Sequence, residues 1–119
     1  MKGYIIFAHG SRIESANTGV RDLVEQFCST GGHLAEPAFL DLAEPNLARA
    51  VELLVQRGAS EVVVIPYFLT LGLHLQRDLP ELVAGVAARY AELTISIAPP
   101  LDGHPALLDA VLDRARESA

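Results

Sequence analysis

Hydrophobic positions along the chain follow two patterns, short continuous apolar runs and longer stripes in which every third or fourth residue is apolar. The clearest run, at residues 61–67, predicts a buried β-strand, because a strand covered on both faces needs apolar residues at successive positions. Three other runs also predict strands, and the one at residues 36–42 is weaker because Pro37 breaks it. These strands are expected over residues 3–8, 36–42, 61–67 and 92–98. The stripes predict four helices, which end near Gly31, run from about Pro45 to Gly58, begin after Asp78 as N-cap, and begin near Pro105.

Strands and helices alternate along the whole chain, which predicts right-handed crossovers. We therefore expect a three-layer, doubly wound α/β fold with a mainly parallel four-stranded sheet in the order 2-1-3-4. A topological switch point then lies between the first and third strands. Residues 1–119 form a single domain in this interpretation, because no linker or repeat divides them. The last helix presents an apolar face of Leu108, Val111, Leu112 and Ala115.

Two histidines follow the first and third predicted strands. His9 comes directly after the run at residues 3–8, and His74 lies in a long loop expected over residues 68–77. Because neighbouring parallel strands end at the same sheet edge, both imidazoles are expected where such folds keep their active sites. Two converging neutral imidazoles indicate a metal site, and Gly10 permits close approach to His9. The alternative is that each histidine only satisfies a backbone carbonyl at a strand end.

Asp41 is the candidate for a third metal ligand. It ends the second predicted strand, which is expected beside the first. Two imidazoles and one carboxylate suit Fe, Co, Ni or Zn, and ligand type alone does not choose among these ions. An open coordination position on the metal would mark a reactive site rather than a structural one. The alternative role of Asp41 is a solvent-facing or helix-capping carboxylate.

Ser11 and Arg12 are candidates for binding an anionic substrate. They precede the first predicted helix, whose free N–H groups and dipole attract negative charge. Arg12 can hold a carboxylate through two parallel hydrogen bonds. Asn17 and Arg77 are further anion-contact candidates. The alternative for Arg12 is an ordinary surface position beside a helix cap.

Three other side chains with metal-binding or nucleophilic potential are expected to lie outside the site. His33 follows two glycines in a connection and is expected to be solvated. His104 precedes Pro105 at a helix start, where it caps the helix or fixes the orientation of another group. Cys28 falls among the apolar residues of the first helix and is expected to be buried.

Composition and charge exclude several classes of partner. Of the 119 residues, 50% are hydrophobic and 20% are charged, and the net charge of −6 argues against nucleic acid or an anionic membrane as partner. The apolar stretches are too short to cross a bilayer, and with one cysteine and no signal-peptide pattern we expect a cytoplasmic location. The GxxxxGK[ST], GxGxxG and GxSxG motifs are absent, so no nucleotide cofactor is expected.

Four blocks of sequence carry a family resemblance. They are AHGSR at residues 8–12 followed by Asn17, FLDLAEP at residues 39–45, PYFLTLGLH at residues 66–74 followed by Asp78 and Pro80, and GHP at residues 103–105. Together they resemble the short CbiX/SirB-type chelatases of tetrapyrrole biosynthesis. The resemblance extends over essentially the whole chain, and it is the combination of the two histidine blocks that is specific.

The resemblance implies the insertion of Co, Fe or Ni into a sirohydrochlorin-type macrocycle without ATP, as in siroheme or cobalamin biosynthesis. His9 and His74 would bind the metal, which is a substrate, and assist removal of the pyrrole protons. Asp41 stands where family members commonly have Glu, and its side chain is one methylene shorter. Arg12 and the helix N-terminus are expected to meet the macrocycle's carboxylates.

Further expectations concern the loop near His74 and the oligomeric state. Tyr67, Phe68, Leu71 and Leu73 are expected to cover the apolar face of the macrocycle, with core or dimer packing as the alternative. Gly72 is a further candidate for substrate contact. The short forms resemble one half of the two-domain chelatases, which implies a homodimer. A non-catalytic metal or tetrapyrrole carrier, and a metabolic binding domain whose histidines only cap strands, remain competing hypotheses.

Overall fold

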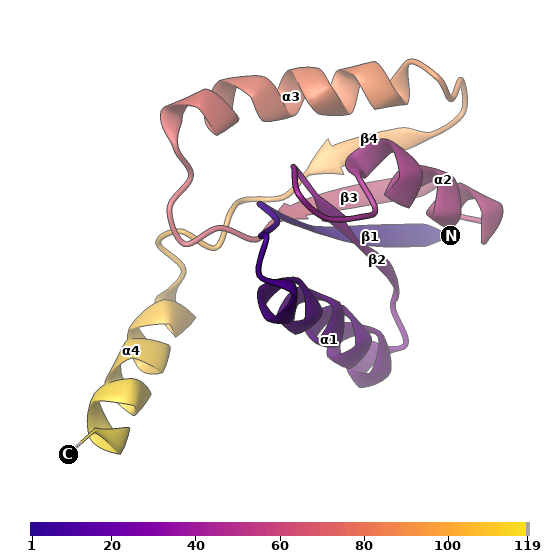
Figure 1. Cartoon of the computed structure of the whole chain (residues 1–119). Coiled ribbons are helices and arrows are strands. Elements are labelled where there is room, and N and C mark those ends of the chain that lie inside the picture. The colour runs from indigo at the N-terminus through magenta and orange to yellow at the C-terminus, as the bar shows by residue number, and fades with distance from the viewer. Residues whose placement is uncertain (119) are drawn as a thin grey trace.

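The computed structural model describes residues 1–118, in which strands and helices alternate from one end to the other (Figure 1). The elements are β1 (Lys2–Ala8), α1 (Glu14–Gly31), β2 (Leu34–Phe39), α2 (Leu47–Gln56), β3 (Glu61–Pro66), α3 (Leu73–Ala87), β4 (Thr94–Ile97) and α4 (Pro105–Glu117). This alternation confirms the predicted α/β class.

The four strands form one parallel sheet in the order β2-β1-β3-β4. Ala8 pairs with Phe39, and Phe7 pairs with Pro66, so β1, β2 and β3 end at about the same level. The loops that follow these strands therefore meet at one edge of the sheet, with the switch point between β1 and β3. The predicted strand order and the predicted edge are both confirmed.

Helices cover both faces of the sheet, α1 on one side and α2 with α3 on the other (Figure 1). Alternate residues of β1 supply the two cores: Ile6 packs with Val24 of α1, and Phe7 belongs to the larger cluster that includes Leu54 and Val83. Burying a side chain of this size contributes about 1.5–3 kcal/mol relative to leaving it exposed. The strand ends that carry the candidate site thus project from a well-packed platform.

Three strands are shorter than the sequence predicts, although β3 lacks only its last predicted residue. β2 ends at Phe39, and Leu42 beyond it has a positive φ of 65°, which turns the chain away from the sheet. Pro37 lies inside β2 and is tolerated there because β2 is an edge strand. β4 covers only Thr94–Ile97.

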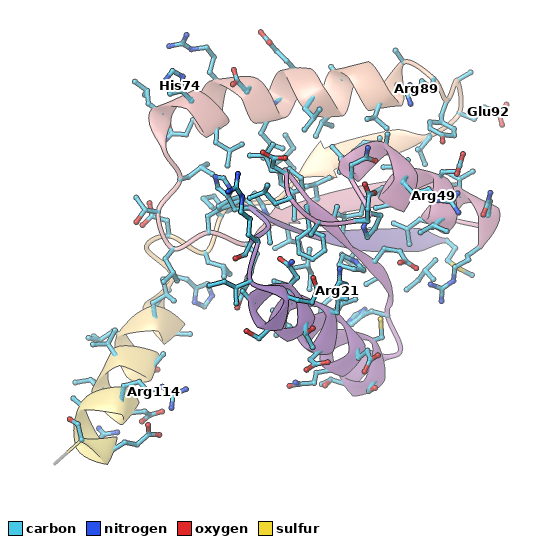
Figure 2. The ribbon with its side chains drawn as sticks, in the orientation of Figure 1. Arg21, Arg49, His74, Arg89, Glu92 and Arg114 are labelled. Carbon is cyan, nitrogen blue, oxygen red and sulfur yellow. The ribbon has the colours of Figure 1, made fainter. Side chains whose placement is uncertain are left out.

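The start of α3 also differs from the prediction. The sequence predicts a loop through residue 77 with Asp78 as N-cap, whereas α3 begins at Leu73 and its N-cap is Gly72. His74 therefore lies in the first turn of a helix and not in a long loop. Figure 2 shows this histidine at the beginning of α3.

Packing explains why α3 begins early. Leu75 packs against the main core and extends the buried stripe of Leu79 and Val83 by one helical turn. The Gln76 N–H donates to the Gly72 carbonyl at 3.0 Å, which closes the first turn. Asp78 resembles an N-cap in sequence, but the packing of the partly buried Leu75 against the core decides where the helix begins.

α4 stands away from the rest of the molecule, beyond the edge where the site lies (Figure 1). None of its residues is buried, and Leu108 and Val111 of its predicted apolar face are 64% and 65% exposed. The His104 ring caps the helix, since its Nδ1 accepts from the Ala106 N–H at 3.0 Å, as the sequence predicts. Within residues 1–118, no helix has the length and apolar character that a membrane span requires.

Candidate metal centre

His9 is the first residue after β1, at the edge where the loops meet. The loop after β2 holds its backbone: the Asp41 N–H donates to the His9 carbonyl at 3.0 Å, and the Leu40 N–H donates to the Ala8 carbonyl at 2.9 Å. The side chain is exposed, and the Phe68 ring lies edge-on with 6.2 Å between centroids. Within residues 1–118 no hydrogen bond occupies the imidazole, so it is free to bind a metal.

Gly10 permits the close contact between the loops after β1 and β2. Its φ is +91°, a conformation that L side chains rarely adopt. A Cβ at this position would lie 1.8 Å from the Asp41 carbonyl oxygen and 3.0 Å from the Asp41 carbonyl carbon. Only glycine therefore allows His9 and Asp41 to be backbone neighbours.

Asn17 ties the other end of the His9 loop to α1. The Ser11 N–H donates to Asn17 Oδ1 at 2.9 Å, and Asn17 Nδ2 donates to the Ser11 carbonyl at 2.8 Å. Asn17 is 2% exposed, so it cannot reach an external ligand, and its predicted anion contact is wrong. The sequence did contain a signal for this role, because Asn17 is aligned with Val20 and Val24 on the inward stripe of α1.

Ser11 and Arg12 face solvent at the start of α1. Ser11 Oγ accepts from the Ile13 N–H at 3.0 Å, which leaves its own O–H free to donate to a ligand. Arg12 is exposed and forms no ion pair with any residue of 1–118. Ile13 is the N-cap of α1 and offers no side-chain acceptor, so the first N–H groups of the helix lack a side-chain cap. This corner can accept an anion.

Glu14 places a negative charge in the same helical turn, and its exposed carboxylate is bound by residues further along α1. It accepts hydrogen bonds from Arg21 and, at 3.2 Å, from Asn17 Nδ2. These two bonds, Arg21 first, lower the pKa of Glu14 below its ordinary value. Arg21 also donates to the Glu44 carbonyl at 3.1 Å and lies over the Phe39 ring, 5.3 Å from its centroid. The loops after β1 and β2 are thus both fastened to α1.

Asp41 adjoins His9 through the backbone, but its side chain has a local partner. Asp41 Oδ1 accepts from the Leu42 N–H at 2.8 Å. Among residues 1–118, no three His, Cys, Asp or Glu side chains gather as a metal site requires. The structure therefore places His9 and Asp41 side by side in the backbone without assembling them and His74 into a three-ligand group.

Leu71 and Gly72 connect β3 to His74. Leu71 is half-buried and lines a cavity of about 410 Å³ between the start of α3 and the end of β4, together with Leu75 and Ile97. Gly72 is exposed, and a Cβ there would meet nothing within 4 Å. The backbone conformation at Gly72 does not require glycine, so the open space beside it is the feature that a ligand could use.

His33 and Cys28 lie at the far end of α1, outside the candidate site. The His33 side chain is exposed as predicted, and it also stacks on Phe27 with 4.5 Å between ring centroids. Cys28 is half-buried, where the sequence predicts full burial. Neither residue approaches the edge that carries His9.

The fold and the site together define a doubly wound α/β protein whose switch-point edge presents a free histidine from the loop after β1 and a second histidine from the helix after β3. The CbiX family model matches residues 3–118, and the chain belongs to the CbiX family.

Known relatives fall into two length classes. A chloroplastic sirohydrochlorin ferrochelatase of Arabidopsis thaliana is 42% identical over 113 residues, which are 94% of this chain and 50% of that protein. A sirohydrochlorin cobaltochelatase of Saccharolobus solfataricus is 31% identical over 126 residues, covering 99% of this chain and 96% of that protein. The chain thus spans about half the length of the ferrochelatase and nearly all of the cobaltochelatase.

A solved structure shares the fold. SirB from Bacillus subtilis, determined with Fe³⁺, superposes with a TM-score of 0.89 at 28% identity, covering 99% of this chain and 47% of that chain. The superposition includes nearly every residue here, so the arrangement of this chain corresponds to one half of the longer protein.

Proposed function

We propose that this chain inserts Fe²⁺, Co²⁺ or Ni²⁺ into a sirohydrochlorin-type tetrapyrrole without a nucleotide. The observation that carries the proposal is the His9 imidazole, exposed at the switch-point edge and free of internal hydrogen bonds, in a chain whose relatives are named sirohydrochlorin ferrochelatase and cobaltochelatase. Imidazole nitrogens suit all three ions, so the histidines alone leave the choice of metal to supply and geometry.

In this proposal His9 and His74 bind the incoming ion and then accept the protons that the macrocycle loses. Insertion forms metal–nitrogen bonds to the ring and releases two pyrrole protons, and imidazoles near neutral pH can act both as ligands and as bases. Asp41 is proposed as the third ligand because its N–H is bonded to the His9 carbonyl, which keeps its carboxylate near the metal. The hydrogen bond that Asp41 Oδ1 accepts from the Leu42 N–H must then break, or Asp41 must bind the metal while keeping it.

The macrocycle is proposed to lie across the open edge between α1 and α3. Its carboxylates would meet the free Ser11 hydroxyl and the unpaired Arg12, through charge-assisted hydrogen bonds. Its apolar face would cover Leu71 and the open space beside Gly72. We also propose a cytoplasmic location for this chain, and its recovery from an organelle or membrane fraction would contradict that part.

A steady-state insertion assay tests the proposal. The purified chain is mixed with sirohydrochlorin and Co²⁺, Fe²⁺ or Ni²⁺ in parallel, and the change in the tetrapyrrole absorption is followed. We expect many turnovers per protein with at least one ion. Binding that stops at one equivalent would identify a carrier, and a rate equal to the protein-free background would reject the proposal.

We further propose a homodimer in which α4 packs on a second copy of the chain. Within residues 1–118, the apolar face of α4 is left exposed. SirB contains the same fold in a chain about twice as long, of which this chain covers 47%. In a homodimer, a second copy of this chain would take the place of the other half of SirB. Dimer formation would bury Leu108 and Val111, and contiguous exposed apolar residues of this kind usually mark protein–protein contacts.

Light scattering after size-exclusion chromatography tests the dimer. We expect the wild type at twice the mass of the chain and Leu108→Asp at the mass of one chain. Ala110→Asp is the matched control, since it adds the same charge on the other side of α4 and is expected to remain dimeric. A monomeric wild type at micromolar concentration would contradict the proposal.

A further inference from the structure

Asn17 is the one polar side chain that is fully buried within residues 1–118. Buried polar groups are retained where they are hydrogen-bonded, and the Asn17 amide makes three hydrogen bonds. Its Oδ1 accepts from the Ser11 N–H at 2.9 Å, and its Nδ2 donates to the Ser11 carbonyl at 2.8 Å and to Glu14 Oε2 at 3.2 Å. One side chain thus occupies both the donor and the acceptor of a single backbone residue.

The neighbouring charges fix which way this amide points. The Glu14 carboxylate only accepts hydrogen bonds, so the amide NH₂ must face it, and Oδ1 is turned toward the Ser11 N–H. Arg21 holds Glu14 in place from the next turns of α1. The orientation of Asn17 is therefore set by an ion pair on the same helix and does not depend on a ligand.

The backbone that Asn17 holds leads directly to His9. The segment from His9 to Ser11 is fastened at its start by the Asp41 N–H, which donates to the His9 carbonyl, and at its end by Asn17. Only Gly10, with its φ of +91°, lies between the two fastenings. Fixing both ends of a three-residue segment fixes the direction in which the His9 imidazole leaves the sheet edge.

We propose that Asn17 is a positioning residue for His9, acting through the Ser11 backbone and without touching metal or macrocycle. The inference rests on the proposed metal-insertion function, in which His9 is a ligand. Groups that orient a metal ligand from behind typically account for about 10–100-fold in metal affinity or activity. The exposed imidazole forms no hydrogen bond within residues 1–118 and has only the edge-on Phe68 ring beside it, so the orientation of His9 depends chiefly on its backbone.

Asn17→Ala removes both bonds to Ser11 and is compared with Asn46→Ala. Asn46 is a matched control because its Oδ1 also accepts a backbone N–H, that of Arg49 at 2.9 Å, but it does so at the N-cap of α2 and makes no bond to the His9–Ser11 segment. In Asn17→Ala we expect about tenfold faster hydrogen exchange of the Ser11 amide. We also expect Co²⁺ affinity and kcat to fall by about 10–100-fold with little change in the KM for the macrocycle. Asn46→Ala is expected to leave all of these quantities within about twofold of wild type.

Asn17→Asp provides a second test that a purely structural role would not pass. The new carboxyl group, when protonated, can accept from the Ser11 N–H and donate its O–H to the Ser11 carbonyl, as the Asn17 amide does, whereas the ionised form loses the donor. The insertion rate of this variant relative to wild type should therefore rise as pH falls. The corresponding ratio for Asn17→Ala, which introduces no titratable group, should be flat.

The outcomes separate this inference from the proposed function. If the chain proves to have no insertion activity, Ser11 exchange and Co²⁺ affinity still report on the positioning of His9. Faster Ser11 exchange in a folded Asn17→Ala, with Co²⁺ affinity and kcat equal to those of Asn46→Ala, would overturn the inference. If Asn17→Ala does not fold, a pH-independent rate ratio for Asn17→Asp would overturn it equally.

Discussion

The two candidate ligands differ in how the protein holds them. The His9 segment is fixed by backbone bonds to the loop after β2, by the Asn17 side chain and by a glycine that allows close contact. His74 is exposed in the first turn of α3, after a connection whose residues are mostly exposed. Segments with few buried contacts open and rearrange most readily. The difference indicates a site with a preorganised half, the His9 segment, and an adaptable half, the connection and first helical turn around His74. Such a site suits the proposed metal insertion, in which a large planar substrate must enter.

The largest expected effect comes from removing the preorganised ligand. His9→Ala should lower kcat by about 10²–10⁴-fold, because under the proposed function it removes a metal ligand and a base together. The free energy of unfolding should change by less than about 0.5 kcal/mol, because the side chain is exposed. The insertion assay and urea unfolding measure the two quantities.

His33→Ala is the control for this prediction. It removes another exposed histidine, one that stacks on Phe27 away from the site. Its activity should match wild type, and equal losses in the two variants would mean that His9 has no special role.

Gly10→Ala should loosen the preorganised half without changing a ligand. The added Cβ would lie 1.8 Å from the Asp41 carbonyl oxygen, so the two loops must separate. We expect kcat to fall by about 10²-fold through misplacement of His9, and stability to fall by about 1–3 kcal/mol.

Gly58→Ala is the control for Gly10→Ala, because it introduces similar backbone strain without a steric clash. Gly58 has a similar φ of +98°, but a Cβ there meets nothing within 4 Å. Thermal unfolding of both variants should show a smaller loss for Gly58→Ala, and insertion rates should fall only for Gly10→Ala. Equal behaviour would show that the contact between the loops does not position His9.

His74→Ala should lower kcat by about 10–100-fold, less than His9→Ala, because the exposed connection before His74 holds this proposed ligand with fewer buried contacts. Gly72→Ala, next to open space, should leave stability unchanged and raise the KM for the macrocycle a few-fold if the ring lies there. Steady-state kinetics with varied macrocycle separates the two effects. A larger loss for His74→Ala than for His9→Ala would reverse the comparison.

The smallest effect concerns the Glu14–Arg21 ion pair, whose carboxylate accepts a hydrogen bond from Asn17. The pKa of Glu14 is lowered in the folded chain, chiefly by Arg21, so its ionised form stabilises the fold at neutral pH and this contribution is lost as pH falls through the lowered pKa. Glu14→Gln should therefore be slightly less stable than wild type at pH 7, and the difference should shrink at acid pH. Urea midpoints at both pH values measure it, and a difference that grows in acid would contradict the assignment.

The general architecture was predictable from the sequence, because strand and helix spacing and the handedness of crossovers leave few topologies open. The strand order and the meeting of the loops after β1, β2 and β3 followed from that pattern. The start of α3 was not predictable from Asp78, since it depends on the packing of Leu75 against the core.

Site details needed three-dimensional packing. The free His9 imidazole was predicted from its strand end, and its proposed role remains to be measured. The part played by Asn17 was missed because its partner, the Ser11 backbone, is close only once Gly10 has turned the chain. The exposure of α4 was equally hidden, since an apolar stripe in sequence does not say which surface will cover it.

A crystal structure of the chain soaked with Co²⁺, with the ion located by its anomalous scattering, tests the central claim most directly. The account predicts Co²⁺ bound to imidazole nitrogens of both His9 and His74 at about 2.1 Å, the distance usual for divalent metals on histidine. The ion lying elsewhere, at His33 or His104 for example, with both His9 and His74 unliganded, would contradict it.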